Sequence, residues 1–389
     1  MGLADSVHKR IDRIFKGIDT AIDKFHRSYL ALVCLLALTG YALVLLFPIL
    51  AVASVSHIYT ALLDGEAINW PLVAIWSVVL VLSALFSYRS LQVKLSPPVG
   101  LTLGEDKAPK IFNLVQQHKA HFKRPGIQRI VITDNYELDI VKVPKWALPV
   151  WSTNTMVIGL PVLLCHSPRQ FECMMARRMG QFSKRNNPVT NWLYQLRAIW
   201  KQYSIAYGKL KYPDSYLLKW LYAAYAAFYT SASVHAARRD ELNADSYAME
   251  LFIHDEVCEM ITADAAYRWY LQERYWPAID KIASAKTASP LTPYLNMAAA
   301  IQSNFKEEKI KPLIYSVLKT ETHRKNPVPA LRQRLENIGH DAPYLKENTG
   351  QNAAAAYLGE SLNNVVKLID TLWLKNNMAK QKSGKKQKA

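Results

Sequence analysis

The sequence is poor in cysteine, and its cysteines do not occur in pairs. The 389 residues include four of them, with no C-x-x-C spacing: Cys34, Cys165, Cys173 and Cys258. A disulfide framework is built from an even set of closely organised cysteines in an oxidising compartment. The scattered pattern therefore favours reduced thiols in a cytoplasmic setting.

Acidic residues are also scarce relative to basic ones. The chain has 48 Lys and Arg against 31 Asp and Glu, a formal net charge of +17. The basic residues gather before residue 28, between Lys184 and Lys211, and in the C-terminal tail. Attraction to an anionic membrane surface explains this most simply. Nucleic-acid binding is the competing explanation, but we find no recognition motif and expect no nucleic-acid partner.

Two segments lack charged side chains entirely, from Ser28 to Leu63 and from Ala67 to Tyr88. A helix rises about 1.5 Å per residue, so about 20 residues cross a bilayer core. We expect two transmembrane helices within residues 28–90, against the alternative of a buried core hairpin. The first run is longer than one span needs, so either Pro48 kinks it or the part after Ala53 lies at the interface.

Charges flanking these segments predict the topology. Lys and Arg precede the first span and follow the second, whereas the short connection carries Asp64 and Glu66 without a basic residue. The positive-inside rule then places both termini and the main domain in the cytoplasm, and we expect a bacterial inner membrane.

Residues 1–27 carry an apolar stripe among basic residues, at spacings of three and four: Val7, Ile11, Ile14, Ile18, Ile22 and Phe25. This pattern predicts an amphipathic basic helix on membrane lipid, although a coiled-coil or packing helix has the same stripe. No cleavage site follows the apolar region, so we expect an anchor rather than a removed signal peptide.

The remaining chain predicts an α+β domain, mostly helical, over residues 91–345. We expect a helix from Lys110 to Phe122, and everything beyond Pro168 reads as helical. Strands are expected at Ile127–Thr133, at its hairpin partner Asp139–Lys142, and at Thr153–Gly159. A C-terminal helix is expected within residues 346–374, followed by a basic disordered tail at 375–389.

The segment from Tyr216 to Ala237 is apolar, with Lys219 as its only charge. Its length suggests a third span. A single further crossing would, however, place Glu241 and Arg177 on opposite sides of the membrane. We therefore expect a buried or interfacial helix here.

A different absence concerns the segment CMMARRMGQFSKR, from Cys173 to Arg185. Its helical frame is that of an H-E-x-x-H zinc-protease motif, in which two His bind zinc and the Glu is the general base. The five corresponding residues are Arg177, Arg178, Met179, Gly180 and Gln181. A guanidinium group offers only N–H donors and a permanent positive charge, so it repels a metal ion.

The flanking blocks give this segment a context. NTMVIGLPVLLCHSPRQFECMMA precedes it, RRDELNADSYAMEL follows, and NPVPALRQRLENIG lies further on, between Asn326 and Gly339. In this order, over roughly Leu91 to Gly339, the blocks resemble the HtpX-like and CAAX-prenyl-protease membrane zinc metallopeptidases, a gluzincin family.

The resemblance implies a gluzincin-like domain with a small sheet behind two transmembrane helices. It places the metal ligands at Arg177, Gln181 and Glu241, the general base at Arg178, and a supporting acid at Asp245. It also implies an edge strand that binds substrate by strand addition, with the candidates Ser152, Asn154, Met156 and Ile158.

With both His ligands and the catalytic Glu replaced, we expect no catalytic residue, no metal and no cofactor. The leading interpretation is a membrane-anchored pseudopeptidase that binds a peptide or membrane-protein partner. The alternative is an active zinc-dependent membrane endopeptidase with an atypical metal site, drawn from His166, Cys173, His235 and Glu241. A purely structural membrane organiser is a third possibility, and no serine or cysteine hydrolase can be assembled from spacing.

Glu241 raises a physical problem if it still faces the motif helix, because an unpaired buried carboxylate is costly. We expect Arg177 or Arg178 to stand in for the ion and pair with Glu241, with Asp245 as a further partner. The alternative is that both arginines face solvent.

Overall fold

The structure is a computed structural model that describes residues 22, 24–63, 68–92, 95, 98–123, 126–144, 152–183, 186–209, 216–284, 291–320 and 326–386. The amphipathic helix expected over residues 1–27 lies almost wholly outside these ranges.

The chain forms two compact units. Unit 1 comprises Met1–Ser96, Pro144–Ser152 and Trp192–Ala237, and unit 2 comprises Pro97–Val143, Thr153–Asn191 and Arg238–Ala389. Residues 192–237 thus interrupt the domain expected at 91–345.

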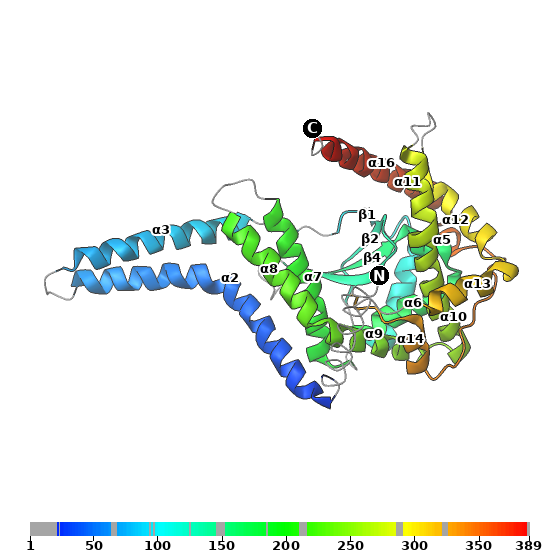
Figure 1. The fold of residues 1–389 in the computed structure, drawn as a ribbon, viewed down its shortest axis with the longest axis horizontal. Helices are drawn as coiled ribbons and strands as arrows, with labels where there is room; N and C mark the ends of the chain where they lie inside the picture. The colour runs from blue at the N-terminus through cyan, green and yellow to red at the C-terminus, as the bar shows by residue number, and fades with distance from the viewer. Residues whose placement is uncertain are drawn as a thin grey trace, which may run out of the picture. The chain divides into compact units, whose positions relative to one another are not determined.

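Unit 1 begins with two long apolar helices, α2 (His26–Leu63) and α3 (Trp70–Gln92), which are long and apolar enough to cross a membrane (Figure 1). Contacts between aromatic rings of α2 and α3 show which residues of the two helices lie side by side. Phe47 contacts Phe86 and His57 contacts Trp76, so ten residues forward on α2 correspond to ten residues back on α3. The helices are therefore antiparallel, and α3 lies along residues 41–63 of α2.

The surplus length of α2 lies at its N-terminal end. Pro48 is inside the helix, which bends without ending (Figure 1). Residues after Ala53 pair with α3, whereas the first part packs against α7 (Pro188–Gly208) and α8 (Tyr216–Ala232).

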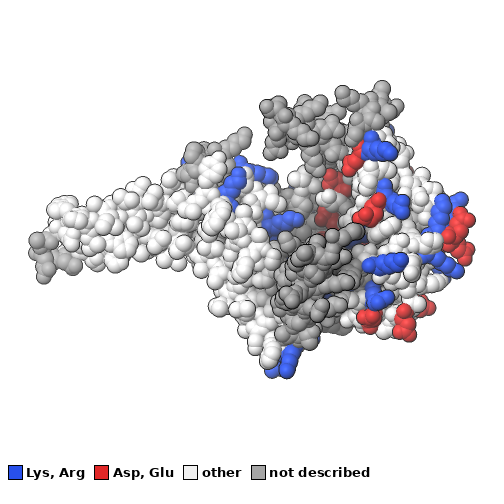
Figure 2. Space-filling view, viewed as in Figure 1, with Lys and Arg blue, Asp and Glu red and all other residues white. Residues whose placement is uncertain are grey.

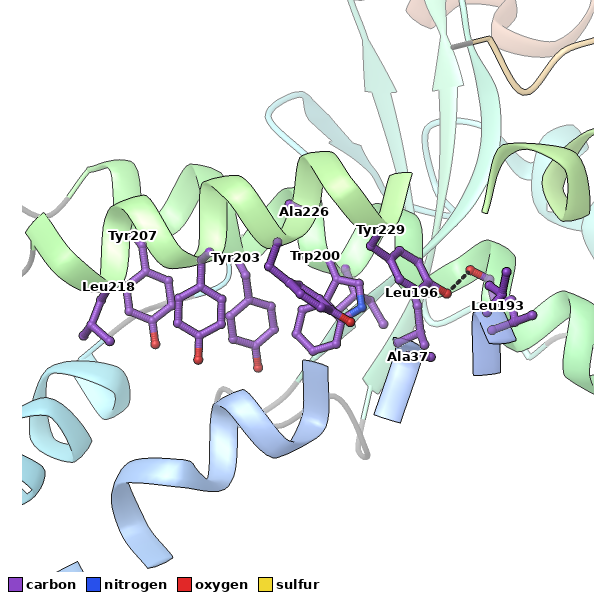
Figure 3. Packing of buried hydrophobic residues seen from close by; sticks show 13 residues of the cluster. Ala37, Leu193, Leu196, Trp200, Tyr203, Tyr207, Leu218, Ala226 and Tyr229 are labelled. Carbon is purple, nitrogen blue, oxygen red and sulfur yellow. Dashed lines mark hydrogen bonds between the residues drawn. The ribbon is translucent and has the colours of Figure 1, made fainter. Parts of the chain in front are cut away.

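An aromatic cluster joins these helices within unit 1 (Figure 3). Tyr207 and Tyr222 stack at 4.3 Å between ring centroids, and the hydroxyl of Tyr229 donates to Leu193 O at 3.0 Å. A Cβ added at Gly40 of α2 would lie 2.4 Å from Trp200 Cζ2. Only glycine permits this approach, so α2 is held closely against α7. The segment expected to be a buried or interfacial helix is α8, which has one buried face.

Unit 2 contains a four-stranded mixed sheet in the order β1-β2-β4-β3, formed by β1 (Leu101–Leu103), β2 (Arg129–Thr133), β3 (Leu138–Pro144) and β4 (Ser152–Gly159). Strand β1 is antiparallel to β2, and β2 is parallel to β4. Gly159 N donates to Glu137 O at 2.6 Å, which joins β4 to the start of β3.

This order corrects two expectations. The segment Asp139–Lys142 is a strand, but it pairs with β4 rather than forming a hairpin with β2. Strand β4 lies inside the sheet, so it is not the expected edge strand. The physical reason is burial. Strands β2 and β4 are strongly apolar and pair in parallel inside the sheet, whereas β3 is only partly buried and lies at the edge.

Helices surround this sheet, so the expected mostly helical α+β class is confirmed. They are α4 (Pro109–Phe122), α5 (Leu160–Cys165), α6 (Pro168–Gln181), α9 (Val234–Ala248), α10 (His254–Tyr270), the π-helical turn η2 (Leu271–Tyr275), α11 (Trp276–Ser284), α12 (Pro293–Asn304), α13 (Glu307–Leu318), α14 (Leu331–Asn337), α15 (Ala353–Leu358), the 3-10 turn η3 (Gly359–Ser361) and α16 (Leu362–Lys386).

The C-terminal region differs from the expectation. Gly359, with φ of 50°, separates α15 from α16, so the expected single helix is broken. Helix α16 then continues to Lys386, across most of the tail expected to be disordered.

Candidate functional site

Helix α6 carries the segment Cys173–Gln181, which the sequence resemblance aligns with a zinc motif. Ser167 caps its start in a capping box with Gln170, and Pro168 occupies the first turn. From Cys173 to Gln181 every residue is buried, the two arginines included. A helix with charged residues inside a core must provide partners for them.

Gly180 sets how closely α6 approaches its neighbours. A Cβ at this position would lie 2.4 Å from Tyr247 Cβ on α9 and 3.2 Å from Phe122 Cε1 on α4. Neither atom belongs to a freely movable chain end. The glycine therefore allows α9 to bring its carboxylates within reach of α6.

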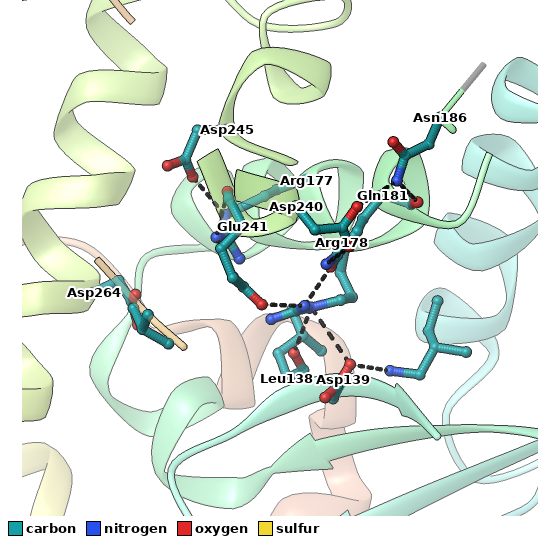
Figure 4. A network of polar contacts seen from close by, with 12 residues as sticks. Leu138, Asp139, Arg177, Arg178, Gln181, Asn186, Asp240, Glu241, Asp245 and Asp264 are labelled. Carbon is teal, nitrogen blue, oxygen red and sulfur yellow. Dashed lines mark hydrogen bonds and ion pairs between the residues drawn. The ribbon is translucent and has the colours of Figure 1, made fainter. Parts of the chain in front are cut away.

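Arg177 lies between two carboxylates of α9 (Figure 4). Its Nη2 donates to Glu241 Oε2 at 2.5 Å, and its Nε donates to Asp245 Oδ1 at 2.5 Å. Nη2 also lies 3.2 Å from Glu241 O. Glu241 is 1% exposed and Asp245 0%, so these are fully desolvated, charge-assisted hydrogen bonds.

Arg178 reaches the other carboxylate oxygen. Its Nη1 donates to Glu241 Oε1 at 3.0 Å and also to Gln181 Oε1, while its Nε donates to Leu138 O at 3.0 Å. The same Nε lies 3.7 Å from Asp139 Oδ1 on β3. Both arginines therefore pair with Glu241, where the sequence suggested one.

A third arginine completes the network. Arg334 of α14 donates to Asp245 through Nε at 3.0 Å and Nη2 at 2.8 Å, and through Nη1 to Asp264 of α10 at 3.0 Å. It is 2% exposed. Sequence reasoning noted Arg334 only as part of the block ending at Gly339 and did not place it in the site. Asp264 was missed, because nothing near it in sequence marks it.

An amide relay extends the network at the end of α6. Gln181 Nε2 donates to Asp240 Oδ2 at 2.6 Å, and Asn186 Nδ2 donates to Asp240 Oδ1 at 2.8 Å. Asn186 Nδ2 also donates to Gln181 O at 2.7 Å. Gln181, at a family ligand position, therefore binds protein groups on both sides of its amide.

Charge in the centre of the site is balanced. Three guanidinium groups face three carboxylates: Arg177, Arg178 and Arg334 against Glu241, Asp245 and Asp264. A buried charge is tolerable only when paired in this way. The network ties α6, α9, α10 and α14 together through charges of the protein itself.

Protonation follows from the same contacts. Burial works to lower the pKa of Arg177 and of Arg334, but the surrounding carboxylates, Asp245 foremost, together outweigh it, and both pKa values are raised. Burial works to raise the pKa of Asp264, but Arg268 and Arg334 hold it well below its usual range. At the periphery, burial raises the pKa of Asp139 and of Asp240. Arg177 and Arg334 therefore stay protonated, and Asp264 stays ionised, across neutral pH.

The residues at the ligand positions that the resemblance implies do not fit a zinc ion. Zinc requires lone pairs from neutral imidazole, thiolate or carboxylate, and the guanidinium N–H groups already occupy the oxygens of Glu241. Within the described ranges, no group of three or more His, Cys, Asp or Glu side chains has the arrangement of a metal site.

The residues of the atypical metal site are accordingly not brought together. His166 Nε2 lies 2.8 Å from the hydroxyl of Tyr136, and the ring of His235 packs edge-on against Tyr29. Cys173 is buried on α6, where burial raises the pKa of its thiol.

The substrate-strand candidates Ser152, Asn154, Met156 and Ile158 lie on β4, which has a neighbour on each side. Strand addition at β4 is therefore ruled out. The edge strand next to β4 is β3, and two main-chain groups of β3 already have partners. Leu138 O accepts from Arg178, and Ile140 N donates to the Asp139 carboxylate at 2.8 Å.

No protein-family model, curated protein or solved structure matches this chain. The resemblance to membrane zinc metallopeptidases stays a prediction from the sequence.

Proposed function

We propose that this chain is a membrane-anchored pseudopeptidase, in which an arginine–carboxylate network replaces the zinc site of a metallopeptidase, and that it binds a membrane-protein partner without cleaving it. The observation that carries the proposal is Arg177 lying between Glu241 and Asp245. These acids are the ones that the resemblance assigns to the metal ligand and its support.

Physical chemistry favours this substitution over a simple loss of ligands. Removing zinc alone would leave Glu241 as a buried, unpaired carboxylate, which is strongly destabilising. Arginine supplies a permanent charge and several directed donors, so one side chain satisfies both acids. The network thus takes over the zinc ion's structural role and supplies no Lewis acid or activated water.

Contacts at the sheet favour a membrane protein over an extended peptide as the partner. Addition of a peptide strand requires free main-chain groups at a sheet edge. At the start of β3 these groups are engaged by Arg178 and Asp139. Two long apolar helices hold the chain where membrane proteins are found. We propose that both termini and unit 2 face the cytoplasm.

Metal content and hydrolysis test the loss of activity. Full-length protein, purified in nanodiscs, should contain no stoichiometric zinc after dialysis against zinc-containing buffer, and should not hydrolyse unfolded casein. One zinc per chain, with hydrolysis that disappears in Glu241→Gln, would establish the working endopeptidase and overturn the proposal.

Rebuilding the motif tests the origin of the site. The triple variant Arg177→His, Arg178→Glu, Gln181→His restores H-E-x-x-H opposite Glu241. We expect it to bind about one zinc per chain and to be stabilised by zinc in thermal unfolding, as expected for a ligand that binds only the folded state. Addition of Glu241→Gln to the triple variant is the matched control and should abolish binding. A folded triple variant without zinc affinity would refute the metallopeptidase architecture.

Crosslinking tests the partner. A photo-reactive amino acid at Lys142 on β3 should give a discrete crosslink to one integral membrane protein in intact cells, and the same group at Glu308 on α13 should not. Crosslinking only to short peptides, or an identical pattern from both sites, would reject a specific membrane-protein partner.

A further inference from the structure

Helix α8 is apolar on both of its faces. One face is buried in the aromatic cluster through Leu218, Tyr222, Tyr225 and Tyr229. The opposite face exposes large apolar side chains, with exposed fractions of 70% for Tyr216, 53% for Leu217, 68% for Trp220 and 62% for Phe228. A water-facing helix normally carries polar residues on this side. The outer face of α8 therefore requires a non-aqueous neighbour.

The location of α8 within unit 1 indicates what that neighbour is. Tyr225 hydroxyl donates to Leu36 O at 2.7 Å, and Tyr29 hydroxyl donates to Ala232 O at 2.8 Å. Helix α8 thus lies along the first part of α2, which α3 does not cover. This part of α2 is itself apolar and exposed, at Leu32, Leu35 and Leu38.

Length places this region at the end of a membrane span. Residues 41–63 of α2 and their partner α3 already provide about 34 Å of helix at about 1.5 Å per residue, which matches a bilayer core of about 30 Å. The first part of α2 and α8 are then level with the lipid headgroups. Trp and Tyr are the side chains enriched at that depth, and Trp220 and Tyr216 are exposed there.

The charged side chains that the structure describes in unit 1 have one sign. Its described residues contain no Asp or Glu, but contain seven basic residues: Lys24, Arg27, Arg89, Arg197, Lys201, Lys209 and Lys219. On the face shown in Figure 2, the α2–α3 hairpin carries neither blue nor red side chains, which leaves the hairpin to the bilayer core. Basic residues around an apolar helix face are the signature of binding to an anionic membrane interface.

We propose that the outer face of α8 and the first part of α2 together form an interfacial surface, seated in the headgroup and upper acyl-chain region of an anionic bilayer. Helix α8 does not cross the membrane, and its exposed aromatic face rests on lipid. A second copy of this unit is disfavoured as the occupant, because both copies would carry the same positive charge.

Spin labels in the full-length chain test the surface. In a background with all four cysteines replaced, single cysteines are placed at Trp220 and Phe228, at Val55 as a span reference, and at Glu308 as a water reference. In nanodiscs containing anionic phosphatidylglycerol, labels at 220 and 228 should collide more often with oxygen than with a water-soluble nickel complex. Their depth should be shallow, with the label at 55 deeper and that at 308 fully accessible to nickel.

Several results would overturn the proposal. Nickel accessibility at 220 and 228 equal to that at 308 would place the face in water. Protection from both reagents would indicate a protein neighbour, and a depth equal to that at 55 would make α8 a third span. Identical depths in purely zwitterionic nanodiscs would remove the requirement for anionic lipid.

Discussion

Arg177 and Glu241 are joined by a hydrogen bond of 2.5 Å between Nη2 and Oε2, on two helices whose residues are 64 apart in sequence. The pair is 9% and 1% exposed at the side-chain level. Solvent screens it little, so its contribution differs in kind from that of a surface ion pair. Substitutions at this pair therefore measure how much the network contributes to the free energy of unfolding.

Removal of one partner from this pair should be strongly destabilising. Arg177→Met leaves Glu241 and Asp245 short of a donor, and we expect a loss of about 3–5 kcal/mol in the free energy of unfolding. Chemical denaturation in a mild detergent measures it. The matched control is Arg169→Met, which removes the exposed pair with Glu256 and should cost less than about 1 kcal/mol.

A double-mutant cycle isolates the coupling of Arg177 with Glu241. Glu241→Gln and Arg177→Met should be less damaging together than the sum of the single changes, because each removes the charge that the other leaves unpaired. Additive losses would mean that the two side chains do not interact.

Arg334 should not tolerate replacement by lysine. Its guanidinium group binds Asp245 through two nitrogens and Asp264 through a third, a geometry that a single ammonium group cannot reproduce. Arg334→Lys should lower the unfolding free energy by about 2 kcal/mol or more and increase hydrogen exchange in α14. Arg332→Lys, at an exposed position of the same helix, is the control and should be neutral.

Gly180→Ala tests the close approach of α6 to α9. The added methyl group would lie 2.4 Å from Tyr247 Cβ, so the helices must separate, at a cost of about 1–3 kcal/mol. Gly350→Ala meets only Asn348 Oδ1 at 3.7 Å and should change stability little. Equal thermal stability of both variants would show that the helices are not in tight contact at Gly180.

Acid should destabilise unit 2 through buried histidines. Burial lowers the pKa of His118 and of His166 to about 4 each, whereas an unfolded histidine titrates near 6.5. The unfolded chain then binds more protons below pH 6.5. Each neutral, buried histidine therefore contributes fully to the free energy of unfolding above pH 6.5. This contribution is lost as the pH falls toward 4, and it amounts to about 3 kcal/mol at most.

His118→Phe isolates one of these contributions. His118 Nε2 has no hydrogen-bond partner among the described residues, so replacing this nitrogen by a ring carbon leaves no partner of Nε2 unpaired. The variant should show a shallower fall of unfolding free energy between pH 6.5 and 4. Gln117→Ala, which removes an exposed side chain of α4 that carries no titratable group, serves as control. An unchanged slope in His118→Phe would show that His118 does not titrate in this way.

Periodicity and charge in the sequence determined the local features of this protein. Charge-free runs give α2 and α3, and the alternation of apolar and polar residues gives α4 and the main strands. The resemblance to zinc metallopeptidases also predicted that Arg177 or Arg178 would pair with Glu241, because a buried acid requires a cation. The predictions of individual helices and strands depend on neighbours in sequence, where helix and strand geometry are fixed.

Strand order and the third arginine were decided only by tertiary structure. Arg334 and Asp264 are 70 residues apart, and Arg334 and Asp245 are 89 apart, so no local pattern connects them. Likewise, β4 lies inside the sheet because β2 pairs with it in parallel, and a strand's own sequence does not specify its neighbour. The division of α2 between α3 and α8 has the same cause, since an unbroken apolar helix leaves open which partner will cover each part.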